Sequence, residues 1–586
     1  MSASILNDHF TKRGKKMEKL VWGIFLSVLF SLCLVSFADA AQDNQVVTVK
    51  DITEDVLAGP GSVSINTNKN ILMSFGAQIR MIPTSESNWD FGMRDDLTLP
   101  GYLGGKLNKS FFQDHPNESG WLNDSYIRSE DRLYFNAMPK TRKWSFYAAL
   151  EFDRPIDTKS VDSRGGKTDD SSNFGLERLQ GTVALTDNIR LHAGWDIWGL
   201  DFGDGGGLVY GDDNPGFWLT GKAGKLDFNI GYFKLQENNF QNEVTDLNDS
   251  NTQDRDLYAG YVTYHFNKTN KIQAFYAYDH IRGIPSGTFL NHVIDEGTGS
   301  KTMISGAKTD SHHIGAYFTG RQGLIEYFAE CVYQFGSADD TGLSATGKAN
   351  DYDISAYAGA ADVAINLKDM VGFTVKPHIG VLYTSGDDDA KDDNLEGYTG
   401  VENCQRFSKY WGGENTIIGD TNMVLGTMLY GYVPELYGNG TPVFTGGLQN
   451  TAGFGGGRGD NPGLTMTSVG IILIPKRFII FHSNVNSFWW NEDIMVTSFA
   501  DGATTTKVDS GYTGTEWDNE LTIALDKNMF IKGQFSWFFP GSTIKDATSA
   551  LTSVTVPSGP AAGTVIPGKR SDDVATRLAA ELIWKF

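Results

Sequence analysis

Residues 574–586, VATRLAAELIWKF, alternate apolar side chains with polar or small ones up to a terminal phenylalanine. One face of this stretch carries Val574, Thr576, Leu578, Ala580, Leu582, Trp584 and Phe586. The other face includes Arg577, Glu581 and Lys585. A period of two residues is typical of a β-strand whose faces meet different surroundings. The stretch therefore predicts a final strand with one apolar face.

The same alternation recurs from residue 70 to the C-terminus, in segments of about ten residues. Eight short polar turns join pairs of these segments, at residues 138–143, 185–188, 221–225, 267–271, 319–323, 366–372, 474–477 and 525–528. Nine longer stretches separate the pairs, at residues 82–124, 155–174, 199–215, 237–254, 282–310, 337–350, 385–462, 491–514 and 541–571. This count predicts eighteen strands with both chain ends on the short-turn side, with sixteen strands as the alternative.

One face of these segments is apolar enough to meet lipid. In residues 189–197, Ile189, Leu191, Trp195 and Ile197 alternate with Arg190 and His192. A bilayer offers no water to a free strand edge, so the sheet must close on itself. We therefore expect an all-β fold, a transmembrane antiparallel up-and-down barrel. A soluble sandwich or propeller is the alternative, but it would not explain the division into short and long connections.

Two charged residues conflict with the predicted lipid face. Asp131 falls beside Leu133 and Phe135, where a charge is costly at mid-membrane. Either a β-bulge turns Asp131 inward, or this part of the strand stands above the membrane. Lys234 is similarly placed, and we expect its side chain to snorkel.

The N-terminal residues predict a secretory leader. A basic stretch beginning at Lys12 precedes an apolar run over residues 20–37 and the tripeptide Ala38-Asp39-Ala40. This order is typical of a cleaved signal peptide at residues 1–40, and an uncleaved membrane anchor is the alternative. Residues 41–69 would then form an N-terminal periplasmic or lumen segment, and residues 70–586 the barrel.

Charge and cysteine content narrow the possible partners. The leader holds five of the 49 basic and three of the 71 acidic residues, so the chain from Ala41 has a net charge of −24. That charge argues against a nucleic-acid partner. Cys331 and Cys404 remain after the leader; one is predicted to face lipid and the other lies in a loop, so we expect no disulfide between them.

With the leader, the turn asymmetry and the ending LIWKF, the chain resembles Gram-negative outer-membrane β-barrels of the porin type. The resemblance covers roughly residues 70–586. It implies that Leu582, Trp584 and Phe586 form the signal by which the barrel-assembly machinery recognises the last strand. In size the chain is similar to the eighteen-stranded substrate-specific and alginate-export porins, but no subfamily motif aligns. The implied location is the outer membrane, in contact with its lipid and with both termini periplasmic. Monomer and homotrimer remain open.

The alternation also predicts which charges line the lumen. The basic set, expected on one wall because the last strand closes against the first, is Arg80, Arg128, Arg132, Arg178, Arg190, His192 and Arg577. The acidic set, expected across the pore, is Glu326, Glu330, Glu516, Asp518 and Glu520. Opposed rows of charge orient dipolar solutes and set ion selectivity. Glu130, Glu151, Asp153 and Asp196 lie among the arginines and are candidates to neutralise them, so simple cross-strand pairing is an equal alternative.

The longest loop, residues 385–462, holds a candidate short helix within residues 421–437. It is expected to fold inward and narrow the pore; the alternatives are that it caps the pore or simply covers the outer surface. Its carboxylates Asp387, Asp389 and Asp393 are weak Ca²⁺ candidates; a solvated acidic loop is the preferred interpretation because no EF-hand spacing is complete. The tripeptide 458–460, RGD, carries little weight for adhesion. His312-His313 is only a weak metal indication.

No linear catalytic or cofactor motif occurs in the chain, so we expect neither enzyme activity nor a cofactor. The sequence favours a porin for passive diffusion of small hydrophilic solutes, with a preference for anions or carboxylates. The alternatives are a surface adhesin or a sheath for a partner protein and, less favoured, a barrel hydrolase.

Overall fold

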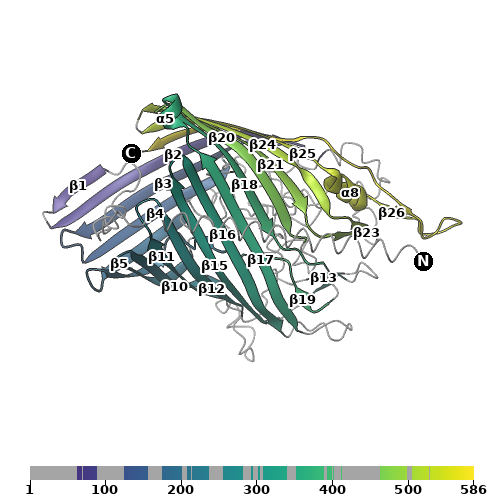
Figure 1. Cartoon of the computed structure of the whole chain (residues 1–586), viewed down its shortest axis with the longest axis horizontal. Coiled ribbons are helices and arrows are strands. Elements are labelled where there is room, and N and C mark those ends of the chain that lie inside the picture. Colours follow the sequence, from purple (N-terminus) through teal and green to yellow (C-terminus); the bar gives the residue numbers. More distant parts are fainter. Residues whose placement is uncertain are drawn as a thin grey trace.

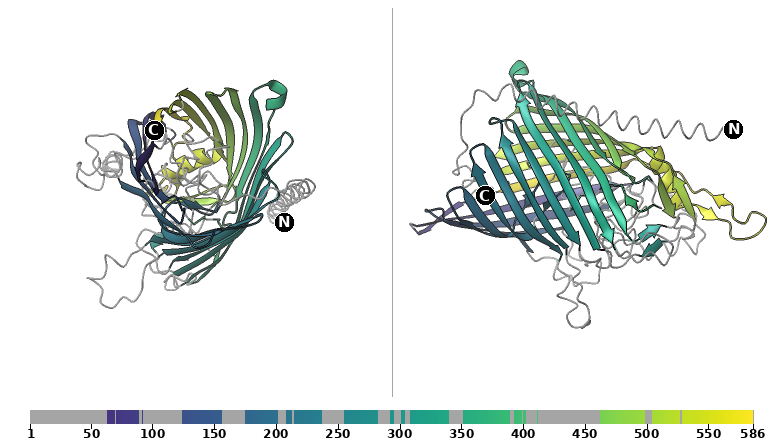
Figure 2. Two further views of the ribbon diagram at one scale, coloured as in Figure 1. Left: turned by 90° about the vertical axis from the view of Figure 1, so that its left-hand side faces the viewer. Right: turned by 60° about the horizontal axis from the view of Figure 1, so that its bottom comes forward.

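The computed structural model describes residues 63–68, 70–88, 91, 124–155, 175–200, 208–212, 214–236, 255–281, 292–294, 301–303, 308–339, 351–388, 392–398, 400–401, 411, 462–497, 504–526 and 528–585. Within these residues, eighteen antiparallel strands form one closed barrel (Figure 1). Seen from one end, the strands form a ring (Figure 2). The predicted eighteen-stranded barrel is confirmed.

The barrel strands follow one another in chain order. They are β2 (Ile71–Ser87), β3 (Asp124–Pro139), β4 (Trp144–Pro155), β5 (Gly175–Ala184), β6 (Ile189–Trp195), β9 (Pro215–Ala223), β10 (Leu226–Gln236), β11 (Arg255–His265), β12 (Lys271–Ile281), β15 (Lys308–Gln322), β16 (Ile325–Asp339), β17 (Tyr352–Ile365), β18 (Thr374–Thr384), β20 (Leu464–Lys476), β21 (Ile479–Trp490), β24 (Gly511–Asp526), β25 (Met529–Pro540) and β28 (Ala575–Lys585). Pairing of β28 with β2 closes the barrel and places Trp584 opposite Ile79.

Shorter elements lie outside this succession. They are β1 (Val63–Asn68), β7 (Trp198–Gly199), β8 (Gly211–Asp212), β13 (His292–Ile294), β14 (Lys301–Met303), β19 (Asn394–Leu395), β22 (Ile494–Thr497), β23 (Thr505–Val508), β26 (Val554–Thr555) and β27 (Val565–Ile566), with helices α5 (Lys368–Val371) and α8 (Ser542–Leu551). No helix among the described residues is long and apolar enough to span a membrane.

All eight predicted short turns join the expected strand pairs, so the short connections gather at one end of the barrel and the long ones at the other. In the turn between β17 and β18 the single helical turn α5 ends at Gly372, whose φ of 87° lies in the left-handed region. A side chain there would be strained, which explains the glycine.

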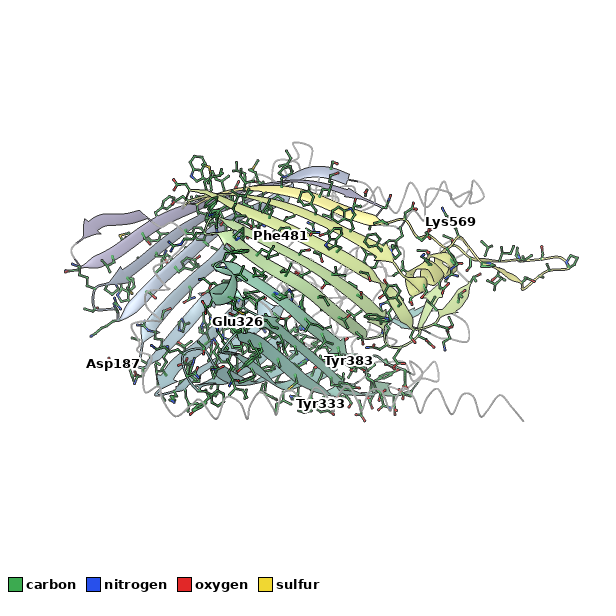
Figure 3. All side chains as sticks on the ribbon, turned by 45° about the horizontal axis from the view of Figure 1, so that its top comes forward. Asp187, Glu326, Tyr333, Tyr383, Phe481 and Lys569 are labelled. Carbon is green, nitrogen blue, oxygen red and sulfur yellow. The ribbon has the colours of Figure 1, made fainter. Side chains whose placement is uncertain are left out.

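The two faces of each strand differ as the alternation predicts. In β28, Leu578, Leu582 and Trp584 are 42%, 45% and 50% exposed, whereas Glu581 is 2% exposed on the opposite face. Of the residues labelled in Figure 3, Tyr333, Tyr383 and Phe481 belong to the outward set and Glu326 to the inward set. An apolar outer surface on a sheet without edges is the way β-structure crosses a bilayer.

The structure corrects one expectation about Asp131. Pairing between β3 and β4 runs in one register from Arg128 to Ala137, so no bulge turns Asp131 inward. Instead, its Oδ1 accepts a hydrogen bond from the backbone N–H of Arg80 at 3.2 Å, and its Oδ2 accepts one from Ser129 Oγ at 2.7 Å. These donors partly replace the water that the carboxylate loses.

Lys234 also has a partner on the outer face. Its Nζ lies 2.9 Å from Oδ1 of Asp256, which also accepts a hydrogen bond from the Tyr232 hydroxyl at 2.8 Å. The charge of Lys234 is therefore paired on the outer face, with Asp256 fully buried, and its snorkelling stays a prediction.

Strand β1 extends the seam of the barrel. β28 covers one edge of β2 from Ser87 to Gln78, and β1 then pairs with residues Phe75 to Ile71 of that same edge. Part of the predicted N-terminal segment therefore joins the sheet. Residues 41–62 and Phe586 lie outside the described residues.

Candidate functional site

A continuous row of ion pairs crosses the inner wall over eight neighbouring elements, from β24 through the seam to the end of β6. We call this row the charge ladder. Its members, in spatial order, are Glu520, Lys532, Glu581, Arg80, Glu130, Arg132, Glu151, Glu177, Arg178 and Asp196. It holds six carboxylates and four cations.

The seam half of the ladder joins strands from the two ends of the chain. Lys532 Nζ lies 3.5 Å from Glu520 and 3.8 Å from Glu581. Arg80 Nε donates to Glu581 Oε2 at 2.9 Å, and another nitrogen of the same guanidinium bonds Glu130. Arg80 therefore bridges β28 and β3 across β2.

The other half centres on Arg132, which contacts three carboxylates. Its Nη2 lies 2.5 Å from Glu151, 3.2 Å from Glu177 and 3.3 Å from Glu130. Arg178 continues the ladder through Glu177 at 3.4 Å and Asp196 at 3.9 Å. Side chains of these ion pairs keep between 1% and 25% of their surface exposed, so the ladder is only partly desolvated.

A β-bulge places Glu177 in the ladder. The β4–β5 register passes from Ala149–Arg178 to Leu150–Leu176, which leaves Glu177 as the extra residue. Simple alternation would turn Glu177 outward, opposite to Arg178. The bulge instead brings its carboxylate inward, with 8% of the side chain exposed. Sequence reasoning missed this residue because a bulge has no reliable pattern.

The ladder corrects the expected positions of the charges. Glu516, Asp518 and Glu520 do not lie across the pore from the arginines, because their strand β24 is separated from β2 only by β25 and β28. Lys532 and Glu581 were also missed, although alternation alone would place both side chains inward. Arg80, Arg132 and Arg178 thus lie among carboxylates on one wall.

The remaining basic residues lie outside the ladder. Arg190 is 8% exposed and donates to the carbonyl of Arg142 at 3.5 Å, near the short-turn end. His192 stacks on Trp218 at 5.2 Å and bonds the hydroxyls of Thr182 and Thr220. Arg577 is buried on the inner face. The side chain of Arg128 is outside the described residues.

The other acidic residues make local contacts. Glu326 pairs with Lys376 at 2.5 Å and accepts a hydrogen bond from Asn366 at 2.9 Å. Glu516 and Asp518 are each 1% exposed, and Asp518 accepts a hydrogen bond from Asn486 at 3.0 Å.

Two long connections fold against the inner wall of β10 to β18. Glu330 accepts a hydrogen bond from the Leu208 N–H at 2.9 Å, and the carbonyl of Leu208 accepts one from the Tyr398 hydroxyl at 2.5 Å. Arg255, paired with Asp279 at 2.6 Å, donates to the carbonyl of Val401 at 2.6 Å. These contacts confirm inward folding for the described start of loop 385–462. Its candidate helix at residues 421–437 lies outside the described residues.

Trp411 is a second anchor of the same loop. It is 2% exposed, its Nε1 donates to Asp362 Oδ2 at 2.9 Å, and its carbonyl accepts a hydrogen bond from Asn486 at 2.7 Å. His378 Nδ1 lies 2.9 Å from the same carboxylate oxygen of Asp362. Trp411 therefore joins β17 to β21 from inside the lumen.

Burial also raises the pKa of one anchor, which keeps it in the neutral form that tyrosine already has at physiological pH. Desolvation raises the pKa of Tyr398 well above its usual range, and the charge of Glu330 adds to the effect. Tyr398 stays a neutral hydrogen-bond donor over the physiological pH range.

The weak metal candidates do not come together in the described residues. Asp392, beside the candidate Asp393, accepts two hydrogen bonds from Asn394, and no group of three potential ligands occurs in the described part of the chain. Asp389, Cys404 and the RGD tripeptide lie outside that part. Cys331 is a free thiol on the outward face of β16.

No protein-family model and no curated protein matches the chain. Several solved structures have a similar backbone fold. One is OccAB2 of Acinetobacter baumannii, with a TM-score of 0.41 and 11% sequence identity; the alignment covers 88% of this chain and 98% of that chain. OccK2 (OpdF) of Pseudomonas aeruginosa, solved in complex with glucuronate, has a TM-score of 0.42, 10% identity and the same coverages. The outer membrane protein OpdK of Pseudomonas aeruginosa has a TM-score of 0.39, 10% identity, and coverages of 88% and 99%.

Proposed function

We propose that the chain is an outer-membrane channel through which small hydrophilic solutes diffuse passively. The observation that carries the proposal is the closed barrel with an apolar outer face and a charge ladder on its inner wall. A polar, charged interior is typical of a barrel whose lumen holds water and solutes, and not of a packed apolar core. The inward loop segments at Tyr398 and Trp411 would narrow the passage.

The orientation follows the usual arrangement of such barrels, with short turns in the periplasm and long loops outside the cell. Both termini are then periplasmic, and the assembly machinery reads the last strand there. Single-channel recording of the refolded chain in a planar bilayer tests the function. Open-channel steps support it. A folded barrel that gives no open-channel steps would favour an adhesin or a sheath for a partner protein. Esterase or protease turnover would favour a hydrolase.

Ion selectivity is the sharper test of the ladder. The arginines alone predict anion preference, which stays untested, and the carboxylates paired with them in the ladder should make any such preference weak. In the ladder, each arginine lies within 4 Å of a carboxylate, so opposite charges cancel over short distances. The wild-type reversal potential in a salt gradient should therefore be small.

Neutralising the ladder charges of one sign should leave the charges of the other sign to set the ion selectivity. Arg132→Gln with Arg178→Gln should move the reversal potential towards cations, and Glu151→Gln with Glu177→Gln should move it towards anions. Charges inside the pore are screened less than exposed loop charges. Asp388→Asn with Asp393→Asn, both exposed in the long loop, is the matched loop control, with a smaller effect that is seen only at low salt. If neither ladder variant moves the potential, the ladder does not set selectivity.

A further inference from the structure

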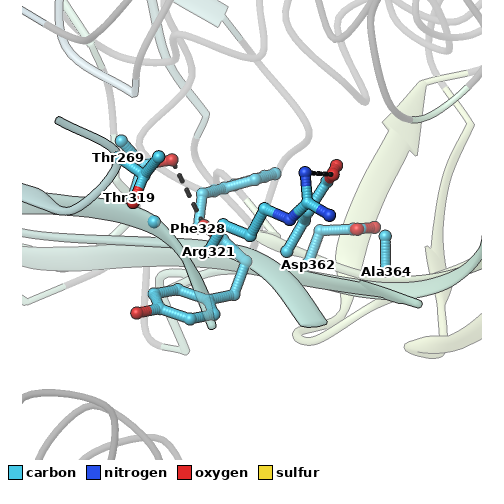
Figure 4. Close-up of a pocket in the computed structure, with 9 residues that line it drawn as sticks. Thr269, Thr319, Arg321, Phe328, Asp362 and Ala364 are labelled. Carbon is cyan, nitrogen blue, oxygen red and sulfur yellow. Dashed lines mark hydrogen bonds and ion pairs between the residues drawn. The ribbon is translucent and has the colours of Figure 1, made fainter. Parts of the chain in front are cut away.

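A pocket of about 240 Å³ opens on the inner wall at the short-turn end, apart from the charge ladder. Strands β15, β16 and β17 form it, with Arg321 reaching across towards Asp362 and Ala364 (Figure 4). The inward side chains that line it combine a cation, two carboxylates and an apolar surface. These are Thr319, Arg321, Glu326, Phe328, Asp362 and Ala364.

The cation of this pocket has unused hydrogen-bond donors. Arg321 Nε donates to the carbonyl of Gly323 at 3.1 Å. Its Nη1 is 3.9 Å from Glu326 Oε1, beyond hydrogen-bonding distance, and none of the described residues accepts from Nη2. The side chain is 44% exposed. The two terminal nitrogens are therefore available as a planar fork for a carboxylate.

The anionic side of the pocket has an unused acceptor. Both partners of Asp362, His378 and Trp411, contact Oδ2, and no described residue donates to Oδ1. Only 2% of this side chain is exposed, and Oδ1 is its remaining acceptor. Glu326 is already paired with Lys376. Oδ1 of Asp362 is thus the place for an ammonium group.

The apolar part comes from Phe328 and Ala364, which are 8% and 4% exposed. It suits a short aliphatic side chain. An ion of one sign would gain one charged partner and be repelled by the other. A compact molecule with both charges matches both partners, and it also matches the alternating signs of the ladder.

We propose that this pocket binds a small zwitterion of the α-amino-acid type, its carboxylate on Arg321 and its ammonium on Asp362. The proposal rests on the proposed channel function, since the pocket lies on the solute path. The pocket would make small α-amino acids the class of solute that the channel passes.

Calorimetry on the purified full chain in detergent tests the site, with L-leucine as the probe. Two analogues each lack one charge: 4-methylpentanoate has no ammonium and 3-methylbutylamine has no carboxylate. We expect leucine to bind and each analogue to bind at least tenfold more weakly. Equal binding of 4-methylpentanoate would overturn the zwitterion class, and absence of leucine binding would overturn the site.

Variants connect the binding to the pocket. Arg321→Gln should weaken leucine binding at least tenfold, and Arg321→Lys should restore part of it, because an ammonium offers charge without the fork. Arg477→Gln, in the exposed turn between β20 and β21, is the matched control and should bind leucine as wild type does. Unchanged binding in Arg321→Gln would overturn the proposal. Asp362→Asn should weaken binding similarly if its barrel still resists SDS; otherwise the Arg321 series decides.

Bilayer recording separates this proposal from the proposed function. Leucine binding that depends on Arg321 in a chain without open-channel steps would refute the channel and leave the pocket. Open-channel steps without such binding would refute the pocket and leave the channel.

Discussion

At the scale of single residues, Glu177 shows how one backbone irregularity changes the chemistry of the lumen. The bulge at Glu177 brings a carboxylate within 3.2 Å of Arg132 and 3.4 Å of Arg178. Without it, the two guanidinium groups would share fewer counter-charges on the same wall. The bulge therefore lowers the positive potential that the arginines alone would create.

Gly380 packs against Trp411, the anchor of loop 385–462, so adding a methyl group at this residue should detach the loop from the inner wall. A Cβ there would lie 2.2 Å from Trp411 Nε1 and 2.7 Å from Asp362 Oδ2. Gly380→Ala should therefore displace Trp411, at a cost of about 1–3 kcal/mol. That cost makes opening of loop 385–462 about 5- to 150-fold more frequent.

Limited proteolysis of the folded barrel measures this opening, because slow cleavage follows the open population. Gly181→Ala is the matched control, since a Cβ at Gly181 would meet nothing within 4 Å. Equal cleavage rates for Gly380→Ala and wild type would mean that Trp411 does not hold the loop.

At the scale of elements, β28 combines three functions in eleven residues. Its outward face carries apolar side chains, its inward Glu581 joins the charge ladder, and its edge closes the barrel against β2. The register with β2 is in phase with the register to β25, so both the outer apolar face and the inner charges continue across the seam. A slip of one residue would turn Glu581 towards lipid.

Deleting Phe586 should slow assembly of the barrel and send the chain to periplasmic proteases, because the last strand would lose its terminal aromatic residue. The measurement is the amount of chain in isolated outer membranes. Phe586→Tyr keeps an aromatic ring and should assemble at nearly the wild-type level. Normal levels of the deletion variant would contradict the role of this residue.

At the scale of the whole molecule, closure gives every barrel strand two neighbours. In lipid each unpaired backbone group costs several kcal/mol, so partial opening of the sheet is strongly disfavoured. The barrel should accordingly resist SDS until heat opens it as a unit.

Electrophoresis of the folded chain in SDS without boiling should give a compact, fast-migrating band. Boiling should convert it into a slower band of the unfolded chain. Trypsin treatment before boiling provides a control, since only long loops should be cut in the folded barrel. Identical migration before and after boiling would count against a closed barrel.

The sequence alone determined the strand number, the turns and the face of most side chains, because a strand in a membrane alternates between lipid and lumen at every residue. The eight turns and the outward face of β28 could be predicted for this reason. The inward positions of Arg80, Arg132 and Arg178 also follow from alternation.

The tertiary structure alone decided which charges meet. Glu581 and Arg80 are 501 positions apart in the chain yet form a hydrogen bond of 2.9 Å, because closure joins the last strand to the first. The bulge at Glu177 and the anchoring of Trp411 on Asp362 likewise depend on neighbours distant in the chain. Alternation predicts whether a side chain points to lipid or to the lumen. It does not predict which residue that side chain contacts, because contacts are set by strand order, register and the path of the loops.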